Sequence, residues 1–317
     1  MADLIAPEEA VQVMAQEFKI DTRCQLYVHV PGARTTLRPG GGSDRVEVTV
    51  SVSGCEHGEA QTVLDRLRLT TRQVKDTVRV EANVQEQQSN PRWWAWVRES
   101  TSATVHLDIR LPPSADTDVR VPGGTLEASD IDGSLTLRVA GGSLHAEGLR
   151  GTLDVRAKSS DVTVEWFDGS TLDLAVSSGS LTARRIDATA VGVEAAAAPV
   201  VLDRIYAAAD VTVHGAETTL RDIRGRLTAR VRGAPVRLEG APGDDSQVSV
   251  HGAPLTAVLP SSWTGNLEVL GSPITIDDRF SFEGERTPDR LSGTVNGGGS
   301  SLTLRAIRDA VRCEASG

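Results

Sequence analysis

Aromatic side chains are scarce in this chain of 317 residues, because Phe, Trp and Tyr together make up only 3% of it. A core built around packed aromatic rings is therefore excluded. Apolar residues of all kinds still reach 39%, so the composition is not that of a disordered chain. We expect a core of aliphatic residues and alanine, whose small side chains keep the interior narrow.

The sequence also lacks the features of a secreted or membrane protein. Its three cysteines, Cys24, Cys55 and Cys313, are odd in number and far apart, so they do not form a disulfide framework. The N-terminus lacks the basic region and apolar run of a signal peptide, and no window approaches about 18 consecutive apolar residues. These absences predict a reduced, soluble, cytoplasmic protein without a transmembrane segment.

Positive charge is in the minority, since 33 Lys and Arg face 43 Asp and Glu, for a net charge of −10. No cluster of basic residues offsets this balance locally. A protein that binds nucleic acid needs such a cluster to neutralise phosphates. We therefore expect no nucleic-acid partner, and the acidic balance is interpreted as an aid to solubility.

What the sequence does contain is a repeat of 18 or 19 residues between Val121 and Ile276. One apolar column recurs at steps of 18, 18, 19, 19 and 18 residues: Ile131, Leu149, Phe167, Ile186, Ile205 and Ile223. A second column recurs at the same two step lengths: Val121, Val139, Ala157, Val176, Ala195, Val213, Val231, Val250 and Val269. A fixed period of this length is the signature of a repeat architecture.

Within each repeat, apolar residues alternate with polar ones, as in Leu135, Leu137 and Val139, and this alternation predicts strands. Glycine and small polar residues separate the strands, so each repeat holds two. Two strands cannot close a core, but stacked repeats can, with backbones about 4.8 Å apart. We therefore predict an all-β fold: a single-stranded parallel β-solenoid with 18–19 residues per rung.

Right-handed winding is favoured for this solenoid, because parallel crossovers strongly prefer that hand. A left-handed helix of three hexapeptides per coil is the alternative. The apolar positions do not hold the six-residue spacing that this alternative requires. The right-handed β-helix is therefore the main prediction.

The residues before the repeats are expected to form an irregular, β-rich cap on the stack. They are predicted to form a short helix within residues 1–20, strands over 25–30 and 45–52, and a second helix over 58–69. Val30-Pro31-Gly32 echoes Val121-Pro122-Gly123, which indicates early rungs on the same stack. The predicted division is 1–117 for the N-terminal cap, 118–305 for the regular rungs and 306–317 for a C-terminal tail.

These features resemble a known family. The residues that carry the resemblance are the leading strand after Phe18, the Val30-Pro31-Gly32 turn, Leu111-Pro112-Pro113 before the rungs, and repeats such as Gly142–Gly151, of the type Gly-Ser-Leu-x-Ala-x-x-Leu-x-Gly. They resemble a bacterial β-solenoid family labelled "putative adhesin", a domain of unknown function, over roughly residues 18–304. The resemblance implies the solenoid fold and brings no catalytic residues with it.

Three of the five tryptophans lie in a polar stretch that interrupts the strand pattern. They are Trp93, Trp94 and Trp96, and Arg92 and Arg98 flank them. A tryptophan cluster with a cationic rim is typical of a surface that binds a partner, a sugar or a membrane interface. The alternative is a lid that folds over the end of the stack. We take these five residues as a candidate loop for binding a protein partner.

Charged residues recur at the outer corners of the predicted rungs. One repeat position holds Asp132, Arg150, Asp168, Asp187, Tyr206 and Arg224. Asp168 and Asp187 would lie on adjacent rungs, about 5 Å apart, which is a separation that glycoside hydrolysis can use. Stacked charges that offset one another in solvent are the simpler interpretation, because the short turns cannot wall a deep cleft.

Metal and phosphate ligands do not cluster in the sequence. His214 and His251 fall two repeats apart in one column, and Cys55 and His57 form only a local pair, well short of a zinc site. The glycine-rich stretch Gly297–Ser301 lacks the lysine of a phosphate-binding loop. We therefore expect no metal and no cofactor.

Three functions remain compatible with this pattern. We favour a non-enzymatic β-solenoid that binds or scaffolds a partner and has no catalytic residue. The first alternative is a self-assembling, cytoskeleton-like polymer, which would need exposed solenoid ends. The substantial flanking segments argue against it. The second alternative is a carbohydrate-active β-helix enzyme. The sequence does not identify a ligand, a pathway or an oligomeric state.

Overall fold

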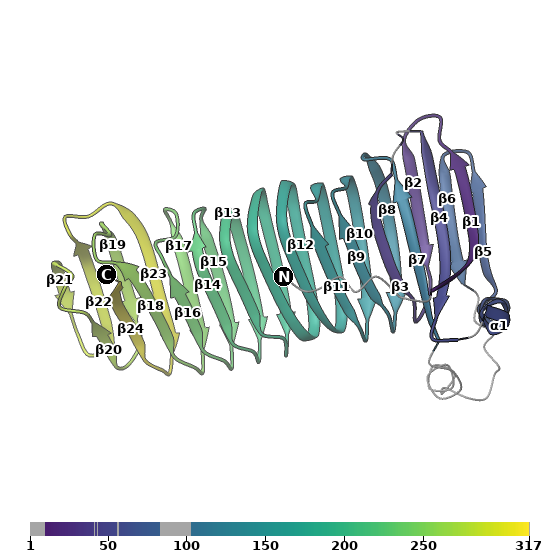
Figure 1. Cartoon of the computed structure of the whole chain (residues 1–317). Coiled ribbons are helices and arrows are strands. Elements are labelled where there is room, and N and C mark those ends of the chain that lie inside the picture. The colour runs from purple at the N-terminus through teal and green to yellow at the C-terminus, as the bar shows by residue number, and fades with distance from the viewer. Residues whose placement is uncertain (1–9, 41, 43, 56, 83–102, 317) are drawn as a thin grey trace. The chain divides into compact units, whose positions relative to one another are not determined.

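The computed structural model describes residues 10–40, 42, 44–55, 57–82 and 103–316 (Figure 1). These residues form strands and one helix, so the all-β class predicted from the sequence is confirmed. The chain forms two compact units, residues 1–156 and 157–317, and each is described by itself. The described helix is too short and too polar to cross a membrane.

The first unit consists of two ladders of paired strands. Its elements are β1 (Val11–Lys19), β2 (Cys24–His29), β3 (Arg34–Pro39), β4 (Arg45–Ser53), α1 (His57–Leu67), β5 (Leu69–Val74), β6 (Thr77–Ala82), β7 (Thr104–Leu111), β8 (Ala115–Pro122), β9 (Thr125–Ser129), β10 (Asp132–Ala140) and β11 (Ser143–Glu147). One ladder has the order β5-β6-β2-β8-β10. The other has the order β1-β4-β7-β3-β9-β11. The pairs β1–β4, β4–β7 and β5–β6 are antiparallel, and the other pairs in these two ladders are parallel.

The echo between Val30-Pro31-Gly32 and Val121-Pro122-Gly123 is a direct contact in the first unit. The amide of Val30 donates to the carbonyl of Arg120 at 3.2 Å, and the amide of Gly32 donates to that of Pro122 at 2.7 Å. The backbones approach closely here: a Cβ on Gly124 would lie 2.1 Å from the carbonyl oxygen of Ala33. The pair β2–β3 therefore lies inside the ladders, between β6–β7 and β8–β9.

The helix predicted within residues 1–20 is wrong over its described part. Residues 11–19 form β1, which pairs antiparallel with β4 from Val11 opposite Val52 to Lys19 opposite Arg45. The sequence also alternates here, and β4 offers a complete edge of unpaired backbone groups. Pairing to that edge satisfies the backbone groups of β1 that face β4, apart from a register shift between Gln12 and Met14, and this outweighs the helical spacing of Val11, Met14 and Phe18.

The helix predicted over 58–69 is confirmed as α1. Glu59 lies in its first turn, where a carboxylate interacts well with the positive end of the helix dipole. Ala60 and Leu64, four residues apart, are its buried side chains. They pack α1 against β1 and β4.

The second unit also consists of two ladders, and β12 (Arg150–Ala196) runs into it from the first. Its other strands are β13 (Val200–His214), β14 (Thr218–Ile223), β15 (Leu227–Arg232), β16 (Val236–Glu239), β17 (Ser246–His251), β18 (Leu255–Pro260), β19 (Gly265–Leu270), β20 (Ile274–Ile276), β21 (Phe282–Arg286), β22 (Arg290–Val295), β23 (Ser300–Ile307) and β24 (Val311–Ser316). One ladder runs β13-β15-β17-β23-β19-β22-β21. The other runs β13-β14-β16-β18-β24-β20. Among the described strands of this unit, only the pairs β19–β22 and β22–β21 are antiparallel.

The predicted apolar columns are confirmed where the registers of the second unit can be followed. Ile205 lies opposite Ile186 on one side and Ile223 on the other. Val231 lies between Val213 and Val250 in the same way. All of these side chains are buried, so the repeat positions chosen from the sequence face the interior.

The last predicted step of the second column is wrong. Val250 does not neighbour Val269, because β23 lies between their strands: Val250 is opposite Ala306, and Val269 is opposite Leu304. The chain passes through β19 and β20 and forms the β21–β22 hairpin. It then returns to insert β23 between β17 and β19, and β24 between β18 and β20. The predicted three-part division into 1–117, 118–305 and 306–317 stays a prediction beside the two units.

Left-handed backbone recurs at two positions of each repeat and forms the turns. One set of positive φ values is found at Gly123, Gly141, Ser159, Ser178, Ala197, Gly215, Gly233 and Gly252. The other is found at Asp130, Gly148, Trp166, Arg185, Arg204, Asp222 and Gly240. Glycine is common at these positions because it adopts this conformation without a steric penalty. At the other residues the left-handed conformation has a steric cost. Trp166 is the one tryptophan among these turn residues.

Candidate binding surface

The loop chosen from the sequence, with Trp93, Trp94, Trp96, Arg92 and Arg98, lies outside the described residues. Its role as a partner-binding site therefore stays a prediction. The described residues offer a different exposed aromatic surface, in the second unit. We call it the aromatic corner, and it consists of Trp166, Arg185, Arg204, Tyr206 and Arg224.

Two of the three large apolar or aromatic side chains that are conspicuously exposed in the described chain belong to this corner. Trp166 is 52% exposed and Tyr206 is 39% exposed. Both flank the buried column: Phe167 follows Trp166, and Ile205 precedes Tyr206. The column residues point inward. Tyr206 points into solvent by the alternation of the strand, and Trp166 does so because its left-handed backbone interrupts that alternation.

Trp166 has a left-handed backbone with φ of 55°, which is rare for a bulky residue. The guanidinium carbon of Arg185, from the following repeat, lies 4.1 Å from the centre of its ring. This is a cation–π contact, and it holds the indole against the corner. Arg185 has the same left-handed backbone, with φ of 55°. The indole therefore occupies a strained turn position on the surface rather than a place in the core.

Tyr206 lies further along the same corner. It is opposite Asp187 in the ladder, and the guanidinium of Arg224 lies 5.2 Å from its ring centre. Asp222 accepts a hydrogen bond from Nε of Arg224 at 3.1 Å, and this carboxylate raises the pKa of Arg224 above its ordinary value. The tyrosine ring thus has a fixed cation beside it, while its hydroxyl remains a possible hydrogen-bond donor or acceptor.

Arg204 completes the corner, in the same repeat as Tyr206. It has the same left-handed backbone and is anchored to Asp203 by an ion pair of 3.4 Å. The carboxylates predicted as an enzyme pair, Asp168 and Asp187, lie in the neighbouring outward column and are both exposed. The corner can therefore offer flat aromatic faces, guanidinium donors and carboxylate acceptors at the repeat spacing.

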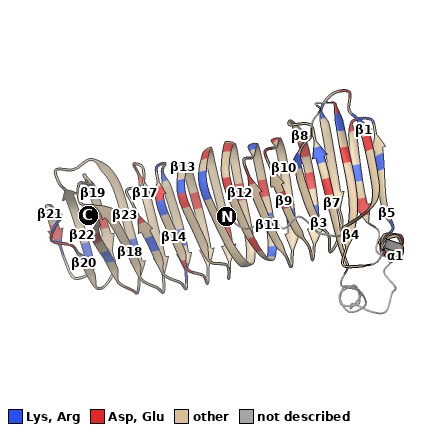
Figure 2. Ribbon diagram, viewed as in Figure 1, with Lys and Arg blue, Asp and Glu red and all other residues tan. Residues whose placement is uncertain are grey.

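A column of alternating charge runs beside the corner, on the outer face of the adjoining ladder. It consists of Glu165, Arg184, Asp203, Arg221 and Glu239, in the order of the repeats. Arg184 contacts Glu165 at 3.6 Å, and Nε of Arg221 lies 2.7 Å from Glu239. Similar alternation is visible on the strands of both units (Figure 2). Opposite charges on adjacent strands favour this register, because a shift would place like charges side by side.

The other residues noted in the sequence do not assemble into a site. His214, Arg232 and His251 do share one exposed column, but Arg232 separates the two imidazoles. Glycines 297–299 form the turn before β23. No group of three or more metal-ligating side chains occurs in the described ranges.

The two buried thiols, Cys24 and Cys313, are not poised for chemistry. Burial, with Asp116 and Asp76 adding to it, raises the pKa of Cys24 to about 11. Burial also raises the pKa of Cys313 to about 12. Both groups therefore stay protonated near neutral pH, and a thiol is a poor nucleophile and metal ligand in that form. The two cysteines act as small apolar core residues.

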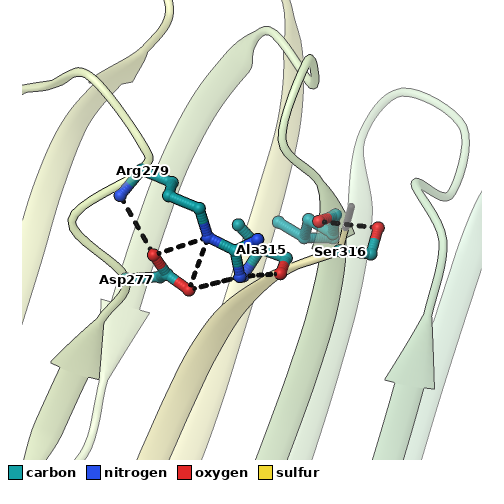
Figure 3. Close-up of polar contacts among 5 residues, drawn as sticks. Asp277, Arg279, Ala315 and Ser316 are labelled. Carbon is teal, nitrogen blue, oxygen red and sulfur yellow. Dashed lines mark hydrogen bonds and ion pairs between the residues drawn. The ribbon is translucent and has the colours of Figure 1, made fainter.

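The last strand of the second unit is fastened by a polar network (Figure 3). Asp277 accepts hydrogen bonds from the amide and the guanidinium of Arg279 and from the amide of Ala315. The same guanidinium donates to the carbonyl of Ala315. These donors, Arg279 above all, hold the pKa of Asp277 well below its ordinary value. The network closes the end of β24 and is structural rather than part of the exposed corner.

The first unit contains a cavity of about 340 Å³ beside α1. It is lined by Val13, Met14, Gln61, Leu64, Asp65, Arg68 and Leu69.

Elsewhere in this unit, the hydroxyl of Ser53 and Nε2 of His106 lie 2.7 Å apart on the outer face of β4 and β7. Burial of the imidazole, and to a lesser degree the charge of Arg34, lower the pKa of His106. His106 is therefore a neutral partner for this hydroxyl near neutral pH.

Tyr206, Asp168 and Asp187 could be placed at this corner from the sequence, whereas Trp166 did not stand out as a surface residue. The sequence did contain one signal: a bulky tryptophan occupies this repeat position, where the other repeats have Asp, Gly or Arg. The stacking of Arg185 on its ring had no signal in the sequence. That contact depends on the 19-residue step between the two residues and on their shared turn geometry.

Comparison with known proteins gives structural similarity without a family. No family model matches the chain, and no curated protein matches it. Among solved structures, the chain is similar to a "putative adhesin" from Parabacteroides merdae, with a TM-score of 0.48, 8% identity and 96% of each chain covered. It is also similar to a "putative lipid binding protein" from Parabacteroides distasonis, with a TM-score of 0.43, 9% identity and coverage of 94% of this chain and 96% of the other. A "putative adhesin" from Bacteroides fragilis gives a TM-score of 0.31 at 8% identity, with 97% of each chain covered.

Proposed function

We propose that this chain is a right-handed parallel β-solenoid that binds another molecule through its outer surface and performs no catalysis. The in-register parallel pairs within each unit support the solenoid, since residues 18 or 19 apart repeatedly lie opposite each other. The observation that carries the binding role is the aromatic corner. Exposed aromatic rings braced by arginines are a recognition surface, and they contribute little to the core.

Catalysis is disfavoured by the position of the carboxylates. Asp168 and Asp187 are exposed on the turn between the ladders, where water screens them. A glycoside hydrolase needs one carboxyl group with a raised pKa, and burial is the usual means of raising it. We therefore assign these two residues to the solvated surface of the corner.

Polymerisation is disfavoured by the strands at the ends of the ladders. In the first unit, the edge strand β5 carries Arg72 and precedes Lys75. In the second unit, the edge strand β21 carries Glu283, Glu285 and Arg286, and β20 is only three residues long. Charged and very short edge strands oppose edge-to-edge pairing. We propose that the protein does not form filaments by stacking its ends.

The tryptophan loop is retained as a second proposed contact, for a protein partner, on the basis of its composition alone. Its contribution can be separated from that of the corner by comparing a variant with Trp93, Trp94 and Trp96 all changed to Ser with a Trp166→Asn variant. A ligand lost only in the first variant would belong to the loop.

The experiment that tests the binding role is a screen of the purified chain against immobilised glycans, phospholipid vesicles and matrix proteins, with product analysis of every ligand that is bound. We expect saturable binding to at least one ligand class and an unchanged ligand after prolonged incubation. Release of reducing ends or fatty acids, lost in Asp168→Asn or Asp187→Asn, would instead identify an enzyme. The absence of saturable binding to any class would remove the binding role.

A further inference from the structure

We infer that the aromatic corner of the second unit binds a linear, uncharged polysaccharide laid along the direction in which the repeats stack. This inference rests on the proposed binding role and specifies its ligand. The corner offers what such a chain requires, namely exposed aromatic rings at intervals along the stacking direction, with hydrogen-bonding groups between them.

The position of Trp166 is costly to the fold and is not explained by packing. The equivalent turn residues in this unit are Arg185, Arg204, Asp222 and Gly240, so the turn forms without an indole. Left-handed backbone at a bulky residue is a genuine outlier, and such strain gathers at functional sites. With half of its surface exposed, this indole contributes less to the core than a buried aromatic side chain would. A ligand that stacks on the ring accounts for its presence.

The spacing of the two rings matches a sugar chain. Arg185, in the repeat that follows Trp166, stacks on the indole, and the next repeat places Arg204 opposite Arg185 and Tyr206 opposite Asp187. Trp166 and Tyr206 lie in neighbouring columns, on either side of the buried column, and are displaced by two strand spacings, or about 10 Å, along the stacking direction. That distance is close to the length of two sugar units in an extended polysaccharide. Alternate units could stack on the two rings while the unit between them faces Asp187, in the intermediate repeat.

The charge balance of the corner favours a neutral ligand over a polyanion. The corner arginines are accompanied by a comparable number of carboxylates, because Asp222 pairs with Arg224 and Asp203 with Arg204. Asp168 and Asp187 add two further acceptors in the neighbouring column. Paired guanidinium and carboxylate groups donate to and accept from hydroxyls, while their net field for an anion is small. The C–H faces of neutral sugars are suited to the aromatic rings.

The test is affinity electrophoresis and calorimetry of the full chain with three neutral probes, hydroxyethyl cellulose, arabinoxylan and galactomannan, and one anionic probe, polygalacturonate. We expect at least one neutral probe to retard the wild type. Trp166→Asn and Tyr206→Ala should each weaken that binding by roughly tenfold, the equivalent of losing one stacking contact. Val74→Ser is the matched control, because Val74 is 61% exposed on a strand of the first unit, and it should bind like the wild type.

A second measurement separates a ligand site from a structural one. Asparagine accepts left-handed backbone better than tryptophan does, so Trp166→Asn should keep or raise the melting temperature while it loses binding. A variant that melts several degrees lower would assign Trp166 to the fold and overturn the inference. The inference would also be overturned if the wild type bound no neutral probe, or if it bound only polygalacturonate and did so in a salt-sensitive manner. If the inference fails in this way while another ligand class is captured in the wider screen, the proposed binding role stands without it.

Discussion

Truncation of one residue in the aliphatic column tests the packing argument most directly. Ile205 is fully buried between Ile186 and Ile223 in its ladder. Shortening such a side chain to alanine removes its transfer free energy and leaves a cavity, at a total cost of about 2–5 kcal/mol. The cost depends on how far the surroundings can collapse.

At this position we expect the upper part of that range, about 3–5 kcal/mol. The neighbouring column residues cannot move into the cavity, because backbone hydrogen bonds fix their strands at the ladder spacing. One of these runs from the amide of Arg224 to the carbonyl of Ile205, at 2.9 Å. Ile205→Val, which removes one methyl group, should cost about 0.5–1.5 kcal/mol. The graded pair of variants therefore measures both burial and rigidity at one site.

The assay is urea unfolding followed by circular dichroism, with hydrogen exchange to show which strands open. Exchange is needed because repeat proteins can unfold in parts. Asp187→Ala is the matched control on the outward column, and it should change stability by less than about 0.5 kcal/mol. If Ile205→Ala and Asp187→Ala are equally harmful, or equally harmless, the assignment of inward and outward positions is refuted.

Three further predictions concern the surface and the end of the second unit. Trp166→Asn should be no less stable than the wild type in thermal melts, because relief of about 1–2 kcal/mol of left-handed strain offsets the loss of about 0.5–1 kcal/mol from the Arg185 contact; a clear loss of stability would contradict the strain argument. Asp277 has its folded pKa below its ordinary value of 3.8, so its contribution is present above that pH and is lost as the pH falls through the folded pKa. Asp277→Asn should therefore lower the melting temperature at neutral pH and flatten its dependence between pH 7 and 2, and an unchanged acid transition would oppose this role. Finally, Glu239→Arg should destabilise the unit by about 0.5–1 kcal/mol, because Arg221 and Arg237 both contact Glu239. Adding Arg221→Glu should recover only part of this loss. If a double-mutant cycle in urea shows no coupling between the two positions, the charge column does not stabilise the register.

Local periodicity in the sequence was sufficient to identify the strands and the buried columns. Ile186, Ile205 and Ile223 could be predicted to stack because their spacing repeats and their neighbours alternate in polarity. The same reasoning failed at Val269, whose 19-residue step from Val250 matches the period equally well. Whether a later strand enters between two neighbours is decided by long-range pairing, which a local spacing cannot report.

The two ends of the chain show the same limit in different ways. The insertion of β2–β3 was partly visible, because Val30-Pro31-Gly32 resembles the turn on which it stacks. The insertion of β23 gave no such signal. Val250 on one side of β23 lies opposite Ala306, whereas Val269 on the other side lies opposite Leu304, so the two column residues do not face the same residue of β23. For β1, helical and strand patterns coexist in the sequence, and the open edge of β4 decided between them.

The candidate site was predictable only as a list of residues. Tyr206 and the two aspartates were visible as one outward column, while the stacking of Arg185 on Trp166 requires the turn geometry of two successive repeats. Exposure also has to be known before an aromatic residue can be separated from the core. Phe167 and Trp166 are adjacent in the sequence, and one is buried while the other is half in solvent.

The placement of β24 has a mechanical consequence. This strand pairs along its length with β18 and, through three residues, with β20 on its other side, and Asp277 clamps its end. Tension applied at Ser316 would therefore load two strand pairings, β24–β18 and β24–β20, in shear at once. Tension applied at Val11 would instead meet β1, which pairs only with β4 in the described chain and can be peeled one bond at a time. A pull through the C-terminal strand should thus need a larger force than one through the N-terminal strand, and a tether attached at that end would hold better under load.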